Sequence, residues 1–270
     1  MASSKRQRQL DAQKAERQAE RRAEDASKRK RIAIIAVVAL VAVALLIVAA
    51  FAVFTRSTEE PTAASSKAPS APATAPTDVH CEDATGINHS GNYQLPQTKN
   101  LPIGSVLELD TNCGRIDIAL EPKKAPITTT AIEYLVNEGW YNSSACSRLT
   151  TASIYVIQCG AGNPDGSGSP GPGFTFKDEN LPGKPPNNYP RGTVAMANAG
   201  PNTNSSQFFL VYKDTTLQPA YTVFGKVIKG LDILDYVAAQ GVAQGSPNPG
   251  DGPLAQPLVI KTASVRTSNG

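Results

Sequence analysis

The chain has 270 residues, enough for one or two domains, and its net charge of +3 is distributed unevenly. Residues 1–31 hold eleven Lys/Arg and five Asp/Glu, a net of +6, whereas residues 81–270 hold thirteen Lys/Arg and fifteen Asp/Glu, a net of −2. The carboxy-terminal part is therefore close to neutral, which excludes an electrostatic case for nucleic-acid binding there.

The first 54 residues predict a charged tail followed by a membrane span. Residues 1–31 show no apolar face, so we expect a solvated cytoplasmic tail. Residues 32–54 are 23 consecutive apolar residues without Gly, Pro or charge. A helix of that length is roughly 34 Å long and can cross a bilayer. A cleaved signal peptide is the alternative, although its apolar region is normally about 7–15 residues.

The charges beside this span set the expected topology. The basic run Lys28–Arg31 abuts the span on its amino-terminal side. The positive-inside rule then keeps the amino terminus in the cytoplasm and exports the rest of the chain. We therefore expect a single-pass protein of the cell membrane whose folded domain is extracytoplasmic.

Residues 55–101 are expected to be a linker and a lead-in to the domain, and residues 102–270 the domain itself. The stretch 55–80 is rich in Pro, Ala, Ser and Thr and nearly devoid of large apolar residues. It cannot bury enough surface to fold, and its prolines favour extended conformations. The sequence thus predicts a disordered, semi-rigid spacer.

Short strands and two helices are predicted within the domain. Residues 105–110 and 115–121 form a hairpin pattern, and helices are expected at 126–138 and 231–240, each followed by a glycine. Further strands are predicted at 146–149, 155–158, 193–196, 208–212, 223–227 and 258–266. This pattern fits an antiparallel β-barrel closed by helices.

Four cysteines lie on the exported side, where disulfides persist: Cys81, Cys113, Cys146 and Cys159. Four cysteines allow three pairings. Cys146 and Cys159 fall on strands expected to be adjacent, near facing positions, which favours the pairs Cys146–Cys159 and Cys81–Cys113. No two cysteines have CxxC spacing, so we expect no metal.

The histidines restrict the chemistry further. Both of them, His80 and His89, lie in or near the linker, and residues 102–270 contain none. Hydrolytic Ser-His-Asp and Cys-His arrangements therefore have no base in the domain. We expect a reaction that needs no nucleophile, no strong acid and no cofactor.

The most informative run is residues 192–209, GTVAMANAGPNTNSSQFF. It predicts the end of a buried strand, a Gly-Pro turn, a polar segment and a return strand. Such a hairpin presents a carboxamide, backbone groups and an aromatic face to one shallow pocket, which suits the binding of an extended peptide. The run resembles the signature of the cyclophilin-type peptidyl-prolyl cis-trans isomerases, and the resemblance extends from about Pro102 to the carboxy terminus.

The resemblance implies a fold and a function. The fold is mainly β, a closed eight-stranded antiparallel β-barrel capped by two helices. The function is acceleration of X-Pro bond rotation in exported or surface proteins by a monomer whose partners are proline-containing polypeptides. The basic flank, apolar span and spacer resemble anchored cyclophilins of high-GC Gram-positive bacteria.

The resemblance also implies the site residues. The family's arginine falls on Arg148, which with Gln207 is the expected catalytic pair, stabilising the twisted amide beside an apolar proline socket. The expected substrate-binding residues are Tyr155, Val156, Gln158, Ala197, Asn198, Ala199, Phe209, Leu217 and Tyr221.

Three departures from the family pattern leave an alternative open. Ser147 stands where a histidine is usual, and two extra residues lie between Arg148 and Gln158. Thr216 replaces a rim tryptophan of many members, so cyclosporin-type ligands are expected to bind weakly or not at all. The alternative is a proline-peptide-binding chaperone module with little turnover, and a purely structural cell-envelope protein is a third reading.

Overall fold

The computed structural model describes residues 78–166 and 171–267, which belong to one compact unit. The predicted tail, the predicted membrane span and the predicted spacer up to residue 77 lie outside the described residues. Within the described ranges, neither helix has the length and apolar character that crossing a bilayer requires.

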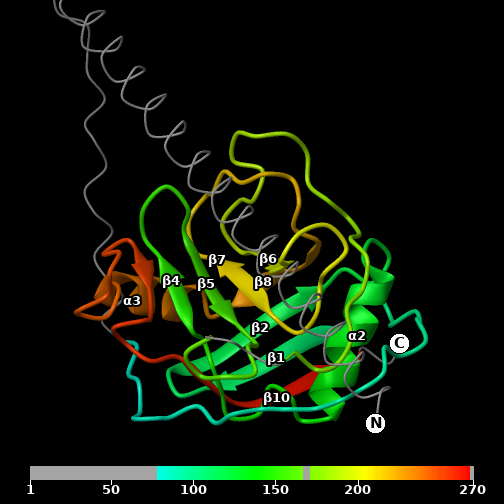
Figure 1. Cartoon of the computed structure of the whole chain (residues 1–270), viewed down its shortest axis with the longest axis horizontal. Helices are drawn as coiled ribbons and strands as arrows, with labels where there is room; N and C mark the ends of the chain where they lie inside the picture. Colours follow the sequence, from blue (N-terminus) through cyan, green and yellow to red (C-terminus); the bar gives the residue numbers. More distant parts are fainter. Residues whose placement is uncertain (1–77, 167–170, 268–270) are drawn as a thin grey trace, which may run out of the picture. The chain divides into compact units, whose positions relative to one another are not determined.

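The unit is built on one curled antiparallel sheet with two helices (Figure 1). The hydrogen-bonded order is β3–β10–β1–β2–β8–β6–β7–β5–β4–β9. The strands are β1 Val106–Thr111, β2 Gly114–Leu120, β3 Ser144–Ala145, β4 Arg148–Thr150, β5 Val156–Cys159, β6 Thr193–Met196, β7 Phe208–Val211, β8 Val223–Lys229, β9 Asp251–Gly252 and β10 Val259–Arg266. The helices are α2 Pro126–Asn137 and α3 Leu231–Gln240.

The predicted mainly β antiparallel architecture with two helices is confirmed, but its closure into an eight-stranded barrel is not. Among the described residues the order has two ends, β3 and β9, so the sheet is an open half-barrel of ten strands. The two additional strands have two residues each, too short for an alternating pattern to reveal.

The core forms because apolar residues alternate along the strands. In the β1–β2 hairpin, Leu107 pairs with Ile118 and Leu109 with Ile116, and all four side chains are buried. Each such burial contributes about 1.5–3 kcal/mol. Helix α2 packs against β10 and helix α3 against β2. Both helices therefore make their main contacts with the part of the sheet formed by β10, β1 and β2.

Helix α2 is capped by a side chain from a distant segment. Pro126 begins the helix without an N–H group, and the next two N–H groups donate to the Glu179 carboxylate. The distances are 3.1 Å from Ile127 N and 2.8 Å from Thr128 N, and the Thr128 hydroxyl donates as well, at 2.9 Å. A carboxylate at this position also interacts favourably with the helix dipole.

Replacing Glu179 with alanine is expected to lower the free energy of unfolding by about 1–2 kcal/mol, because the first-turn N–H groups lose their acceptor. The matched control is Lys177→Ala at an exposed position two residues away, expected to change stability by less than about 0.5 kcal/mol. Urea titration of both variants tests this, and equal midpoints would contradict the capping role.

Residues 78–101, which we call the strap, pack against the sheet although they precede the predicted domain boundary. In Figure 1 the strap is the cyan segment along the lower edge of the unit. Ile87 N donates to Ser143 O at 2.9 Å, and Tyr93 N donates to Pro172 O at 2.7 Å. The strap forms no strand or helix, so no periodic pattern reveals it in the sequence.

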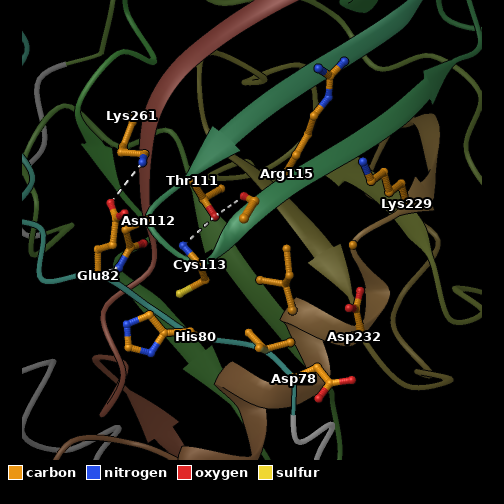
Figure 2. Close-up of a pocket in the computed structure, with 14 residues that line it drawn as sticks. Asp78, His80, Glu82, Thr111, Asn112, Cys113, Arg115, Lys229, Asp232 and Lys261 are labelled. Atoms are coloured by element: carbon orange, nitrogen blue, oxygen red, sulfur yellow. Dashed lines mark hydrogen bonds and ion pairs between the residues drawn. The ribbon is translucent and has the colours of Figure 1, made fainter.

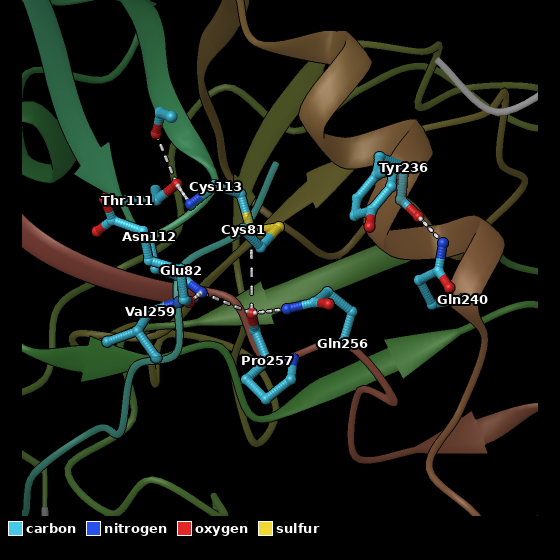
Figure 3. The surroundings of a disulfide bond; sticks show 11 residues. Cys81, Glu82, Thr111, Asn112, Cys113, Tyr236, Gln240, Gln256, Pro257 and Val259 are labelled. Atoms are coloured by element: carbon cyan, nitrogen blue, oxygen red, sulfur yellow. Dashed lines mark hydrogen bonds between the residues drawn. A yellow bond between two sulfur atoms is a disulfide. The ribbon is translucent and has the colours of Figure 1, made fainter. Parts of the chain in front are cut away.

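Both predicted disulfides, Cys81–Cys113 and Cys146–Cys159, are confirmed. Figure 3 shows the first, which joins the strap to the β1–β2 turn. Beside it the buried Asn112 side chain donates to Glu82 O at 2.8 Å and to Pro257 O at 3.1 Å, and accepts from Val259 N at 2.8 Å. This amide fixes the strap, the turn and the start of β10 together.

The strap also carries the half-buried His89, whose ring lies 5.8 Å from that of Trp140. Burial lowers the pKa of His89 below its ordinary value of 6.5, against the opposing effect of carbonyl groups at Asn142 and Ser143. The His89 Nε2 atom is buried without a hydrogen-bond partner, so protonation there would bury an unpaired N–H group.

The unit is therefore expected to lose stability as the pH falls below about 6.5, because the unfolded chain takes up a proton at His89 before the folded chain does. A His89→Phe variant, which keeps a ring beside Trp140, is expected to lack this loss. Thermal unfolding between pH 5 and pH 8 measures it, with exposed His80→Phe as control. An unchanged pH dependence in His89→Phe would contradict the interpretation.

Candidate active site

The β-strand register brings the central predicted residues into one row. Arg148 of β4 lies opposite Gln158 of β5, and Gln158 lies opposite Phe209 of β7. Directly opposed residues project from the same face of a sheet, so a cation, a carboxamide and an aromatic ring stand side by side. They line a cavity of about 200 Å³.

Strand alternation separates this face from the main core. Leu149, Ile157 and Leu210 project into the large buried cluster. Their neighbours Val156 and Phe209 belong to a second, smaller cluster. The strands β4, β5 and β7 therefore carry the core on one face and the cavity on the other.

The structure brings together eight of the predicted residues in this cavity, with Ile154 as a ninth that sequence reasoning missed. Its lining comprises Arg148, Ile154, Val156, Gln158, Ala197, Asn198, Phe209, Leu217 and Tyr221. The other two predicted residues there, Ala199 and Gln207, line an adjoining hollow of about 250 Å³ that shares Gln158, Ala197 and Asn198 with the first. The two hollows form a continuous groove.

Tyr155 is the exception among the predicted residues. It does not line either hollow; its ring packs 5.9 Å from that of Tyr212, and Lys213 Nζ lies 4.5 Å from its centre. Successive side chains of an extended chain point to opposite faces, so Tyr155, which directly precedes Val156, points away from the cavity. Ile154 lines the cavity instead of Tyr155, and it lies in a turn where Ser153 has a φ of 66°.

The polar residues of the groove form a hydrogen-bond chain. Arg148 Nη1 donates to Gln158 Oε1 at 3.4 Å, and Gln158 Nε2 donates to Gln207 Oε1 at 2.8 Å. Gln207 lies two residues before Phe209, the partner of Gln158, and so shares its face. Since Gln207 accepts through its oxygen, its N–H donors stay available to a bound ligand.

Arg148 also forms an ion pair that the sequence did not predict. Its Nε and Nη2 atoms donate to Asp251 Oδ1 and Oδ2, both at 2.6 Å. This hydrogen bonding raises the pKa of Arg148 and lowers the pKa of Asp251. The Arg148 guanidinium is therefore charged near neutral pH, and its two hydrogen bonds to one carboxylate fix its orientation.

The apolar floor is stiffened by an aromatic residue that sequence reasoning also missed. Phe209 packs edge-on against Tyr221 at 5.5 Å, and Tyr189 lies 6.1 Å from Phe209. The Tyr189 hydroxyl accepts from Tyr221 N at 3.0 Å, and burial raises its pKa to about 12. Tyr189 thereby fixes the segment that carries Leu217 and Tyr221.

The Asn198 side chain is bonded to backbone groups of the protein itself. Its Nδ2 donates to Ala220 O at 2.8 Å, and its Oδ1 accepts from Gly200 N at 3.2 Å. These bonds tie the turn after β6 to the 217–221 segment. Asn198 and Ala197 both line the groove.

Ser147, where the family usually has a histidine, is nearly buried beside the 160–166 loop. A Cβ atom on Gly166 would lie 2.7 Å from Ser147 Oγ. The close approach of this loop leaves no room for a ring at position 147 in the described conformation.

A larger hollow, of about 570 Å³, lies beside the Cys81–Cys113 disulfide and contains none of the predicted site residues. Figure 2 shows charges of both signs around it, with Glu82 and Lys261 paired at 3.1 Å. Arg115 in its wall is already bound to Asp117 at 2.6 Å. Such compensated charges give no preference for a charged ligand.

Comparison with known proteins identifies the family. The profile described as "Cyclophilin type peptidyl-prolyl cis-trans isomerase/CLD" matches residues 106–265. A probable peptidyl-prolyl cis-trans isomerase B of Mycobacterium leprae is 44% identical over 163 residues, covering 56% of this chain and 54% of that one. Peptidyl-prolyl cis-trans isomerase B of Bacillus subtilis is 39% identical over 119 residues, covering 44% and 79%.

Among solved structures, a cyclophilin type peptidyl-prolyl cis-trans isomerase of Cryptosporidium parvum, determined in the presence of the dipeptide Ala-Pro, has a TM-score of 0.49 at 26% identity, covering 60% of this chain and 99% of that one. The chain spans about half the length of the mycobacterial relatives it matches. The family profile covers the whole sheet from β1 to β10 except the last residue of β10. The chain belongs to the cyclophilin-type peptidyl-prolyl cis-trans isomerase family.

Proposed function

We propose that this domain accelerates cis-trans isomerisation of X-Pro bonds in exported or surface polypeptides. The observation that carries the proposal is the row Arg148–Gln158–Phe209, which sets a fixed cation beside an apolar floor. Curated relatives at 39–44% identity carry the name of this activity.

The proposed mechanism is electrostatic and needs no covalent step. Amide resonance opposes rotation by about 18–20 kcal/mol. Twisting the bond localises the lone pair on the prolyl nitrogen, so a donor aimed at that nitrogen binds the twisted amide better than either planar form. Arg148 supplies the donor, and Gln207 holds the carbonyl side.

The proline ring is proposed to occupy the apolar part of the cavity. Val156 and Phe209 are each 4% exposed and form its floor. Leu217 and Tyr221 pack against the same cluster and form a wall. Burial of the ring there removes apolar surface from water and fixes its position relative to Arg148.

We also propose that the domain is a monomer, lies outside the cytoplasm and is anchored by the apolar run 32–54. Pairing of all four cysteines suits an oxidising compartment. Weak cyclosporin binding is part of the proposal, because Trp140 is 1% exposed with its Nε1 bonded to Gly160 O. Trp140 therefore cannot replace the rim tryptophan whose place Thr216 takes.

The test is acceleration of cis-to-trans exchange in a short X-Pro peptide, which is uncatalysed over tens to hundreds of seconds at about 25 °C. Peptide binding is measured in parallel by titration calorimetry. Faster exchange supports the proposal. Binding without faster exchange would favour the chaperone module, a reading consistent with the partial neutralisation of Arg148 by Asp251.

A further inference from the structure

The ion pair between Arg148 and Asp251 occupies a defined part of the guanidinium. Asp251 binds the Nε and Nη2 donors on one edge, at 2.6 Å each. An arginine has five N–H donors, so three remain. One of these, on Nη1, points to Gln158 Oε1 at 3.4 Å, inside the cavity.

Asp251 is presented by strand pairing. In β9 it lies opposite Thr150 of β4, and Arg148 is two residues before Thr150. This diagonal relation places the two side chains on one face of the sheet. Thr151 N donates to Gly250 O at 2.9 Å, and Asp251 N donates to Asn248 O at 3.1 Å, which fixes the backbone that leads into Asp251.

Close packing behind β9 supports the same placement. A Cβ atom on Gly252 would lie 2.3 Å from Ser246 Oγ and 2.8 Å from Val242 Cγ1. The segment from Val242 to Asp251 therefore folds tightly on itself, and the carboxylate reaches Arg148 from a fixed backbone. No residue of this segment lines the groove hollows described above.

We propose that Asp251 is a positioning residue that holds the Arg148 guanidinium with its remaining donors directed at the bound X-Pro bond. The inference rests on the proposed function. The Arg148 side chain is 42% exposed, so without a partner it would sample several rotamers and have to be ordered at each turnover. A donor aimed before the substrate arrives avoids that reorganisation.

The effect is expected on kcat more than on KM. Asp251 does not line the cavity whose apolar floor is proposed to hold the proline ring, so ground-state binding should be retained. Only the interaction made in the twisted state depends on where the guanidinium points.

The variants are Asp251→Ala and the isosteric Asp251→Asn, which keeps one acceptor. We expect Asp251→Ala to lower kcat about tenfold and Asp251→Asn to lower it less, with KM within about twofold of wild type. The matched control is Asp235→Ala. It breaks the pair with Arg191, which has Nη1–Oδ1 and Nη2–Oδ2 distances of 2.5 and 2.7 Å and lies outside the groove.

A readout independent of turnover is the ¹⁵N NMR signal of Arg148 Nε–H in the protein. Slow solvent exchange is expected in wild type and fast exchange in Asp251→Ala, while Asp235→Ala leaves the Arg148 signal unchanged. Asp251→Asn keeps the test valid if the alanine variant does not fold.

An unchanged or higher kcat in both Asp251 variants, or an unchanged Arg148 Nε–H signal, would overturn the inference. A higher kcat would mean that Asp251 masks the arginine instead of positioning it. A wild-type protein that does not accelerate exchange refutes the proposed function, and with it the catalytic role of Asp251. An active wild type with unaffected Asp251 variants refutes this inference alone.

Discussion

Replacing Arg148 with alanine is expected to lower kcat/KM for X-Pro isomerisation about 10²-fold, the usual effect of removing one preorganised donor from a site. Arg148 is the only cation lining the groove hollows described above. Gln158 and Gln207 would still bind a peptide backbone, so affinity should fall far less than turnover. Progress curves with an X-Pro peptide, together with calorimetric binding, measure the two effects separately.

Two further variants make this result specific. Arg148→Lys retains a charge but cannot form the two-atom contact with Asp251. We therefore expect a kcat/KM between those of the wild type and Arg148→Ala. Arg191→Ala removes the comparable pair with Asp235 and should leave kcat/KM at the wild-type value while the domain stays folded. If Arg148→Ala turned over peptide as fast as Arg191→Ala, the electrostatic mechanism would be wrong.

The row across β4, β5 and β7 could be anticipated because its three strands have recognisable patterns and the family resemblance points to Arg148, Gln158 and Phe209 on them. Asp251 could not, since its two-residue strand sits among Gly, Asn and Pro residues that are typical of a loop. Its partner is 103 residues away in sequence. A pairing of that separation is set by the tertiary fold and leaves no local signal.

The strap escaped prediction for a different reason. It is held by backbone hydrogen bonds to irregular segments and by single rings such as Tyr93, which packs edge-on against Trp140 at 6.2 Å. Neither these backbone hydrogen bonds nor these single ring contacts require apolar residues at the spacing of a strand or a helix, so the sequence shows no pattern. The cysteine pairing was the one strap contact that could be inferred, because the expected pairing of Cys146 with Cys159 on adjacent strands leaves Cys81 and Cys113 for each other.

Removing the strap disulfide with the double change Cys81→Ala and Cys113→Ala is expected to lower the free energy of unfolding by about 4 kcal/mol. The bond spans 32 residues, and the loss follows from the entropy that a loop of this length regains in the unfolded chain. Because no strap residue lines the groove hollows described above, kcat/KM should stay within about twofold of wild type. Guanidinium titration under non-reducing conditions measures the stability.

The second disulfide provides the contrast that tests this reasoning. Cys146–Cys159 spans 13 residues, so its removal is expected to lower stability by about 3 kcal/mol. It also joins the segments that carry Arg148 and Gln158, two residues and one residue away, and its loss should lower kcat/KM several-fold. If both double variants lost activity equally, the strap would have to act on the groove; if neither lost stability, loop closure would not be the main contribution of either bond. The expected pattern, stability lost in both and activity lost in one, would assign the strap to folding and the β4–β5 bond to the site.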